Sequence, residues 1–423
     1  MRVAIEVDIG QSAYHVGDEA IAHGAVYQLG RRGITDIVLL TRDPEQTRSL
    51  HPETDVAHTL RFPWSPADRE RYLNEIKRVM AGERSALPAD DQVFGVIETI
   101  RGVDALFIAG GGNMNSRYGW LLYERAALAH IAVALGKQIV IGGQTLGPEL
   151  SPADAGTLRN LLRNASLVGL REDHSLRLAR KLAPGHGGLR PCFDDAAELP
   201  LAGLARGRAV ADVIAATFSP PSGSSDRDET AITCARVLGV AAARFSVPVH
   251  FVPHVSTPAR SDADAEFHRA VGKAMTAEFV FRQIRPALET AAATYAARAV
   301  VTSRYHPVVF ACAVGIPVIA IAPDEYSRVR MEGCLARFGI DLHVPLTGEV
   351  TSDAAIEQLV TACIESARPA SFLAAHTAWW DSIAAALAST DERRRKLVRH
   401  FLRSRRHDAN RLRARFGRTQ AAR

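Results

Sequence analysis

The first half of the chain alternates short apolar runs with longer stretches in which apolar residues recur at helical spacing. The apolar runs are rich in Val, Ile and Leu and do not alternate with polar residues, which is typical of strands buried on both faces of a parallel sheet. Strands followed by helices in this order predict a sheet covered on both sides. The predicted strands span 2–9, 34–41, 103–112, 137–144 and 166–172, and the helices 17–33, 66–82, 119–136, 152–164 and 173–182.

The pattern breaks at 191–208, where prolines and glycines interrupt the periodicity, and then a second series of apolar strands and helices begins. Two successive α/β halves predict two Rossmann-like domains whose parallel sheets face a cleft, the arrangement called GT-B in glycosyl-transferring enzymes. We place an N-terminal domain at 1–200, a C-terminal domain at 201–390 and a basic helix or tail at 391–423.

Composition supports a globular protein with more than one core. The chain has 423 residues, of which 47% are hydrophobic and 23% charged, and this balance excludes a disordered protein. No apolar run is long enough to predict a transmembrane helix. The five cysteines are scattered without a CxxC pair, which indicates a cytoplasmic, reducing setting and argues against a zinc site or a disulfide framework.

The positive net charge is a property of the C-terminal end. Residues 391–423 carry 13 Lys and Arg against three Asp and Glu, so the rest of the chain is mildly acidic although the whole has a net charge of +5. The favoured interpretation is a solvated basic tail. A second interpretation is peripheral contact with the anionic inner face of a membrane, where a lipid-linked glycan could lie. No segment resembles a nucleic-acid-binding module, and we expect no nucleic-acid partner.

The strongest candidate for ligand binding is the stretch TSRYHPVVFACAVGIPVIAI, which begins at Thr302. Proline is favoured at the first position of a helix, so the sequence predicts a helix from Pro307 to a stop at Gly315, with His306 as its N-cap. Arg304 closes the preceding strand. A guanidinium, an imidazole and the positive end of a helix would then share one location, which predicts an anion site. The simpler alternative is a capping histidine without further function.

Other polar residues follow predicted strands, at the end of the sheet where ligands bind in such folds. The glycine run 110–112 allows close approach of a ligand to the backbone. It is not GxGxxG, and no acidic residue ends the next strand, so a nicotinamide or flavin site is only weakly supported. Glycine runs are common at strand ends, and at Gln144 a crowded turn is the alternative. The candidates for substrate binding are His15, Asp18, Gly111, Gly112, Asn113, Gln144, Arg171, His254, Tyr326 and Arg328.

Three of these candidates have competing structural interpretations. Asp18 could simply cap the helix that follows. Arg171 could pair with the acidic residue beside it rather than with a ligand. His254 lies near Asp262 and Asp264, but the spacing fits no standard metal pattern, so we favour substrate contact or a structural role and predict no metal site.

Taken in order, these motifs resemble the polysaccharide pyruvyl transferase family. The matching residues are Gly17-Asp18, Gly110 to Gly112, Gly143 to Pro148, Arg171 to Ser175, Ser303 to His306, Ala313 with Gly315 and Pro317, and Tyr326 with Arg328. The resemblance implies a GT-B-like fold and phosphoenolpyruvate as co-substrate, without a further cofactor. The product would be a pyruvate ketal on two hydroxyls of a saccharide or lipid-linked glycan. The acceptor would lie on the N-terminal side and the donor anion mainly in the C-terminal domain.

The resemblance also suggests roles for individual residues. His306 would donate a proton to the donor or bind its phosphate, with Arg304 beside it. Lysine is usual in the family where this chain has Arg328, and arginine could clamp phosphate there but could not exchange a proton. Asparagine is usual in the family at His15.

Two rival functions remain open from the sequence. A sugar-nucleotide glycosyltransferase would share the architecture and would need an acidic residue for the ribose, for which Asp324 or Glu325 could serve. An inactive binding protein would keep the fold, but the joint presence of Arg171, Arg304 and His306 argues against it.

Overall fold

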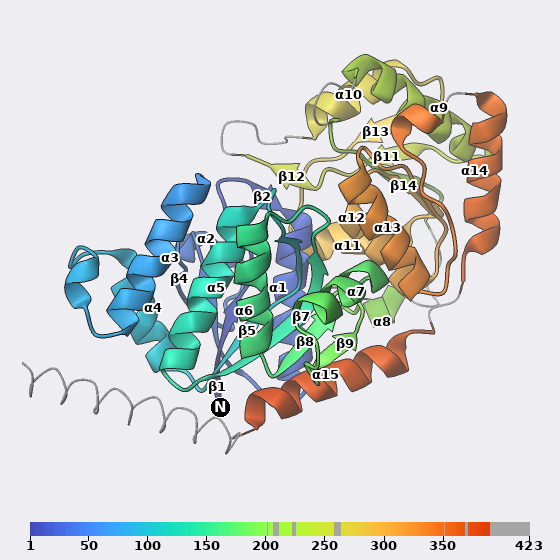
Figure 1. Ribbon diagram of the computed structural model, residues 1–423. Coiled ribbons are helices and arrows are strands. Elements are labelled where there is room, and N and C mark those ends of the chain that lie inside the picture. Colours follow the sequence, from blue (N-terminus) through green and yellow to red (C-terminus); the bar gives the residue numbers. More distant parts are fainter. Residues whose placement is uncertain are drawn as a thin grey trace, which may run out of the picture.

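The structure is a computed structural model that describes residues 1–200, 202–205, 211–221, 226–257, 264–350, 352–368 and 371–389. Two α/β domains lie against each other (Figure 1). The first contains an eight-stranded sheet in the order β4-β3-β1-β5-β7-β8-β9, with β6 paired to β7, and the second a five-stranded sheet in the order β13-β11-β10-β14-β15. Every strand pair in these two sheets is parallel, which confirms the α/β prediction.

The elements of the first domain follow the predicted order. Its strands are β1 (Arg2–Glu6), β3 (Asp36–Thr41), β4 (Asp55–His58), β5 (Ala105–Ile108), β6 (Gly111–Met114), β7 (Gln138–Leu146), β8 (Leu167–Leu170) and β9 (Leu189–Pro191). Its helices are α1 (Val16–Gly30), α2 (Pro44–Leu50), α3 (Pro66–Met80), α4 (Gln92–Arg101), α5 (Gly119–Ala134), α6 (Pro152–Asn164) and α7 (Asp173–Leu182), with the short 3₁₀ helix η1 (Arg84–Ala86).

The second domain is smaller. Its strands are β10 (Ile214–Thr217), β11 (Val249–Phe251), β13 (Phe279–Phe281), β14 (Ala299–Thr302) and β15 (Val318–Ala320). The remaining helices are α8 (Ala202–Ala205), α9 (Arg227–Phe245), α10 (Ala265–Lys273), α11 (Ala287–Ala296), α12 (Tyr305–Val314), α13 (Glu325–Arg337), η2 (Thr347–Glu349), α14 (Asp353–Ser366) and α15 (Leu373–Ala388).

Burial explains why the central strands lack polar alternation. All nine residues of β7 are buried, because helices cover both faces of the first sheet. One apolar cluster lies under α3 to α7, and a second lies under α1 and α15 on the opposite face. A parallel sheet enclosed in this way holds its strand ends rigidly, and the cleft lies at those ends. No helix in the described part of the chain has the length and apolar character needed to span a membrane.

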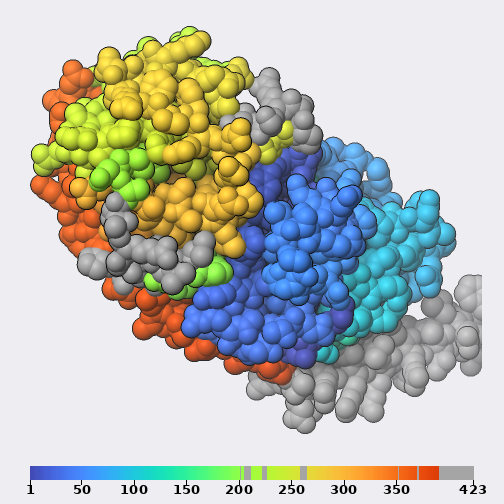
Figure 2. Space-filling model, turned by 180° about the vertical axis from the view of Figure 1, so that it is seen from behind, coloured from blue at the N-terminus to red at the C-terminus, as the bar shows by residue number. Residues whose placement is uncertain are grey.

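The last described helix does not belong to the second domain, although the sequence-based boundary placed 201–390 there. Helix α15 returns to the first sheet and packs beside β7 and β5. Trp380 is fully buried, lies 5.7 Å edge-on to Phe107, and donates from Nε1 to His376 Nε2 at 3.1 Å. Figure 2 shows this orange-red segment leaving the second domain and continuing along the lower edge of the first. The basic segment 391–423 lies outside the described residues.

A small two-stranded sheet joins the domains at the cleft. β2 (Tyr14–His15) pairs antiparallel with β12 (Val255–Ser256), so each domain contributes one strand. The Val16 N–H donates to the His254 carbonyl at 3.0 Å, and the Tyr14 hydroxyl accepts from the Ala287 N–H at 2.8 Å. These bonds fix the start of α1 against the second domain.

Helix α12 starts two residues earlier than predicted. It begins at Tyr305 with Arg304 as N-cap, so His306 lies inside the first turn and Pro307 is the third helical residue. Proline lacks an N–H, and the first-turn N–H groups have no acceptor within the helix, so the first turn tolerates proline at this position. The Arg304 N–H donates to Thr302 Oγ1 at 2.9 Å. The helix ends at Gly315 with a positive φ of 79°, as predicted.

Candidate active site

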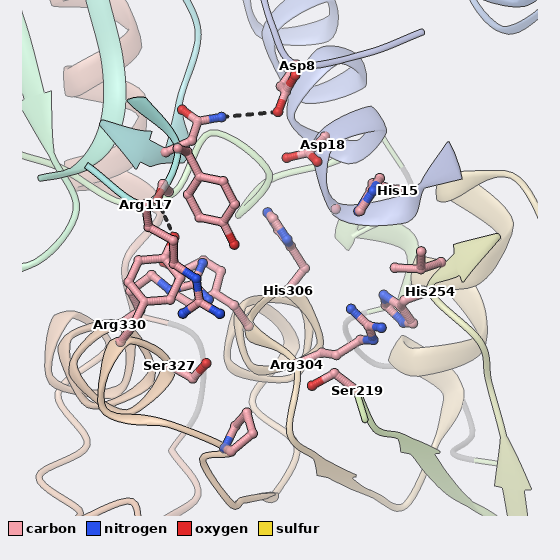
Figure 3. A pocket seen from close by; sticks show the side chains of 18 of the residues that line it. Asp8, His15, Asp18, Arg117, Ser219, His254, Arg304, His306, Ser327 and Arg330 are labelled. Carbon is pink, nitrogen blue, oxygen red and sulfur yellow. Dashed lines mark hydrogen bonds between the residues drawn. The ribbon is translucent and has the colours of Figure 1, made fainter. Parts of the chain in front are cut away.

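A cavity of about 360 Å³ lies between the domains, beyond the carboxyl ends of their strands. The first domain contributes Asp8, which follows β1, and His15 and Asp18 at the start of α1. The second domain contributes Arg304 and His306 at the start of α12, and Arg330 from α13. Figure 3 shows these side chains approaching one another from the two sides.

The structure brings most of the sequence candidates to this cavity. The wall contains His15, Asp18, Gly112, Asn113, Arg171, His254, Arg304, His306 and Tyr326. Gly111, Gln144 and Arg328 are not among its lining residues. Gly111 and Gln144 lie deeper in the first domain, and Arg328 lies on another face of α13.

Gly111 and Gln144 belong to the layer beneath the cavity. Gln144 is fully buried, and its amide donates to the Ala109 carbonyl. The buried Asp195 carboxylate accepts the N–H groups of Gly110 at 2.7 Å and Gly143 at 3.0 Å. Burial raises the pKa of Asp195 to about 7 in spite of these two bonds. The glycine turns are therefore held from below by a side chain of this chain, a contact that no local motif predicted.

The arginine of α13 that faces the cavity is Arg330, and the sequence analysis named Arg328 instead. Arg328 pairs with Glu325 and Glu349 away from the cavity. On a helix, residues four apart share a face and residues two apart do not. Arg330 therefore lies beside Tyr326, with its guanidinium carbon 3.9 Å from the Tyr326 ring centre and 5.3 Å from that of Tyr305. The four-residue spacing from Tyr326 could have identified Arg330 from the sequence.

Arg330 also differs from the other arginines in the wall by its lack of a carboxylate partner. Arg117 pairs with Asp324 at 2.9 Å, and Arg304 pairs with the fully buried Asp264. Within the described residues Arg330 has no ion pair, and its buried Nε has no hydrogen-bond partner. An uncompensated guanidinium aimed into a cavity is a strong attractor for an anion.

Arg171 is held rigidly beside Arg330. Its Nη1 donates to Asp194, its Nε lies 2.9 Å from Thr145 Oγ1 and 3.1 Å from Glu172 Oε1, and its guanidinium carbon lies 4.2 Å from the centre of the Tyr305 ring. The pairing with the neighbouring Glu172, which was the alternative to ligand binding, is therefore present. Nη2 is oriented toward Gly112, because a Cβ at that glycine would lie 3.0 Å from it.

The three imidazoles of the wall all have lowered pKa values, which favours their neutral forms. Burial lowers the pKa of His306 to about 4, although Asp194 opposes the shift, with its Oδ1 3.9 Å from Nε2. Burial and the charge of Arg304 lower the pKa of His254 to about 3 and that of His15 below its usual value. The positive charge of the cavity wall therefore comes from guanidinium groups, and the lowered pKa makes His306 a poor proton donor near neutral pH.

Asp18 differs from the imidazoles because its pKa is raised. It is partly buried, and burial together with the neighbouring Asp8 charge raises its pKa well above the usual range. Asp8 is compensated by Arg42 at 2.7 Å and by the Asn113 amide at 3.2 Å. A carboxyl group with a raised pKa keeps its proton to higher pH and can act as an acid. In Figure 3, Asp18 and His306 face the same part of the cavity.

Three helices begin at the cavity without a side-chain cap. The N-cap residues of α1, α5 and α12 are His15, Tyr118 and Arg304, and none of them accepts an N–H with its side chain. All three line the cavity. Their first-turn N–H groups add to the positive potential of this space.

The family of the chain follows from a comparison with family models. Residues 15–325 match the model described as polysaccharide pyruvyl transferase. The chain belongs to the polysaccharide pyruvyl transferase family. The matched range includes His15, Arg171, Arg304 and His306 and ends just before Tyr326 and Arg330, so the family model covers most of the cavity. No curated protein matches the chain.

Solved structures show the same architecture at low sequence identity. A putative UDP-N-acetylglucosamine 2-epimerase from Listeria monocytogenes aligns with a TM-score of 0.56 and 11% identity, over 93% of this chain and 98% of its own. The UDP-GlcNAc 2-epimerase from Neisseria meningitidis bound to UDP-GlcNAc aligns with a TM-score of 0.52 and 9% identity, over 95% and 100%. Identities this low establish the fold alone. The pyruvyl transferase family member described here therefore has a GT-B-type fold, as predicted.

Gly17 packs directly against His306 across the domain boundary. A Cβ at position 17 would lie 1.9 Å from His306 Nδ1, whereas one at Gly30 on the same helix would meet nothing within 4 Å. Helical Gly→Ala exchanges usually stabilise by up to about 1 kcal/mol. We expect Gly30→Ala to follow this rule and Gly17→Ala to destabilise by about 1–3 kcal/mol, because His306 must move. Urea unfolding of both variants tests this, and equal effects would contradict the packing described.

Proposed function

We propose that this protein transfers the pyruvyl group of phosphoenolpyruvate to two hydroxyls of a saccharide and forms a cyclic ketal. The observation that carries the proposal is the uncompensated Arg330 guanidinium in a small cavity of a pyruvyl transferase family member. A volume of about 360 Å³ lies near the small end of ligand pockets, which span about 300–1,000 Å³, and suits a small donor with one sugar ring.

The donor carries a phosphate and a carboxylate, so its binding needs several donors in a small volume. Arg330 supplies an unpaired planar fork, and Arg171 supplies Nη2 from a fixed position. The uncapped first turn of α12 lies beside them. Negative charge at this point should also raise the pKa of His306 from its lowered value, which makes the neutral imidazole a stronger base.

We assign the proton donor to Asp18 and the base to His306. Asp18 gives its proton to the methylene carbon of the donor, which becomes a methyl group and leaves positive charge on the central carbon. An acceptor hydroxyl attacks that carbon while His306 takes its proton. The carbon–oxygen bond to phosphate then breaks with its electron pair on phosphate. A second hydroxyl closes the ketal and its proton goes to the departing phosphate, and solvent returns the proton of His306 to Asp18.

The glycosyltransferase alternative would need Asp324 or Glu325 to hold the donor ribose, and the contacts of these residues do not favour that role. Asp324 caps α13 through the Ser327 N–H at 2.8 Å and also binds Arg117 at 2.9 Å. Glu325 is exposed and pairs with Arg328 outside the cavity. Asp324, which lines the cavity, is therefore already engaged, and Glu325 is not among the lining residues. Within the described residues no group of three or more His, Cys, Asp or Glu is arranged to hold a metal ion.

The proposal is tested by incubating the protein with phosphoenolpyruvate and a panel of mono- and oligosaccharides. We expect release of inorganic phosphate only with an acceptor that carries two suitably placed hydroxyls, together with a mass gain of one pyruvyl unit on that acceptor. UDP-glucose in place of phosphoenolpyruvate serves as the control donor. Sugar transfer from UDP-glucose without any pyruvylation would overturn the proposal in favour of glycosyl transfer.

A further inference from the structure

A second cavity, of about 840 Å³, adjoins the candidate active site on the first domain. The two cavities share Gln11 and Trp120 in their walls, so they are neighbours separated by these residues. Trp64 forms part of the second wall only. The mechanism proposed above makes no use of this space.

Two tryptophans form a platform between the cavities. The rings of Trp64 and Trp120 are stacked, with centres 3.8 Å apart and planes at 21°. Trp64 is 73% exposed, more than the other exposed large apolar side chains of the described chain. The Tyr118 ring lies edge-on to the Trp120 ring, with centres 5.6 Å apart, and its centre is 6.1 Å from that of the Tyr326 ring. A row of aromatic rings therefore leads from the second cavity, here called the groove, to the candidate active site.

The position of Trp64 is set by its backbone neighbours. It lies between Pro63 and Pro66, and Ser65 caps α3 by accepting the Asp68 N–H at 3.2 Å. The Trp64 carbonyl accepts a hydrogen bond from Arg69 Nη1 at 3.3 Å. Proline and the cap restrict the backbone on both sides of Trp64, and stacking on Trp120 restrains its ring. An exposed aromatic ring held in this way is preorganised for a ligand.

The chemistry of the groove favours a neutral polyhydroxylated ligand. Its wall contains three cationic and three anionic side chains, namely Arg42, Arg48, Arg61, Asp43, Glu45 and Glu124. Arg42 and Glu124 pair with each other, and the exposed Arg48, Arg61, Asp43 and Glu45 provide hydrogen-bond donors and acceptors without the positive excess that an anionic membrane or a polyanion requires. A sugar ring combines a face of C–H groups, which can cover an indole, with hydroxyls around its edge for the polar wall.

We propose that the Trp64–Trp120 platform and its groove bind the sugar next to the one that is pyruvylated, so that the acceptor is an oligosaccharide or a glycan chain end. This inference rests on the proposed function, because it takes the first cavity as the place of the terminal acceptor ring. Because Gln11 and Trp120 line both cavities, a saccharide chain that extends from the first cavity on this side would meet the platform.

Saturation-transfer NMR of wild type and Trp64→Ala tests the proposal without turnover. The probes are methyl glycosides of glucose, galactose and mannose, and di- and trisaccharides that end in each of them. We expect at least one oligosaccharide to bind roughly tenfold more tightly than the monosaccharide with the same end group, with saturation on its second ring. Trp64→Ala should remove that gain and Trp64→Phe should keep part of it. Ile232→Ala, at a distant side chain that is 50% exposed, should leave it unchanged.

The outcomes separate this inference from the proposed function. Calorimetry with phosphoenolpyruvate should give equal affinity for wild type and Trp64→Ala, because Trp64 is outside the donor cavity. Absence of donor binding in the wild type would reject the proposed function even if oligosaccharides bind. Equal oligosaccharide binding by wild type and Trp64→Ala would overturn the platform. Loss of sedimentation with phosphatidylglycerol vesicles in Trp64→Ala, with saccharide binding intact, would also overturn it and assign Trp64 to a membrane.

Discussion

Replacing Arg330 by alanine is expected to lower kcat/KM for phosphoenolpyruvate by roughly 10²- to 10³-fold, because truncating a charged partner in a desolvated site costs about 2–5 kcal/mol. Arg330 has no compensating carboxylate within the described chain, so its charge is available to the donor. The loss should appear in the donor affinity, measured by calorimetry, as well as in turnover, measured by phosphate release.

Arg328→Ala is the matched control on the same helix. Its side chain binds Glu325 and Glu349 outside the cavity, so turnover should stay within about twofold of the wild type, because exposed pairs contribute little. Arg330→Lys should fall between the two alanine variants, since lysine keeps the charge and loses the planar fork. A large loss in Arg328→Ala with none in Arg330→Ala would show that the donor lies elsewhere.

Asp18→Asn is expected to lower kcat by roughly 10²- to 10⁴-fold, the usual contribution of a positioned acid or base. Donor affinity should change little, because a protonated carboxyl and an amide are both neutral and similar in shape. Single-turnover phosphate release separates this effect on chemistry from binding. Normal turnover in Asp18→Asn would reject Asp18 as the acid and return that role to His306.

The pH profile gives an independent test of the same assignment. The pKa of Asp18 is raised, so the acid form persists above its ordinary range and is lost as the pH rises through the raised value. Wild-type kcat should therefore fall on the alkaline side, and Asp18→Asn should lack that limb at its low residual rate. His306→Gln should keep the alkaline limb. Loss of the limb in His306→Gln alone would contradict the assignment.

Local sequence patterns were sufficient to locate the residues of the site that directly follow strands. The apolar runs located the strands, and in a parallel sheet this also locates the residues that follow them, such as Arg171 and Arg304. Helical periodicity around Tyr326 would have indicated Arg330, but the family pattern drew attention to Arg328. The error shows that the face of a helix decides which side chain enters a cavity.

Other features depend on contacts between distant segments and leave no local signal. Asp194 and Asp195 follow β9 in an irregular stretch, yet they hold Arg171 and the two glycine turns. Helix α15 returns to the first sheet because Trp380 and its neighbours fill an apolar face there. The pKa shifts of His306 and Asp18 likewise come mainly from burial between the two domains. None of these could be predicted from the residues alone.

Calorimetric titration of phosphoenolpyruvate into the protein tests the central claim most directly, since it needs no knowledge of the acceptor. We expect saturable binding of one donor per chain to the wild type, retained in Arg328→Ala and lost in Arg330→Ala, with no competition from UDP-glucose. Absence of phosphoenolpyruvate binding in the wild type, or binding that survives Arg330→Ala unchanged, would contradict the assignment of this cavity as the donor site.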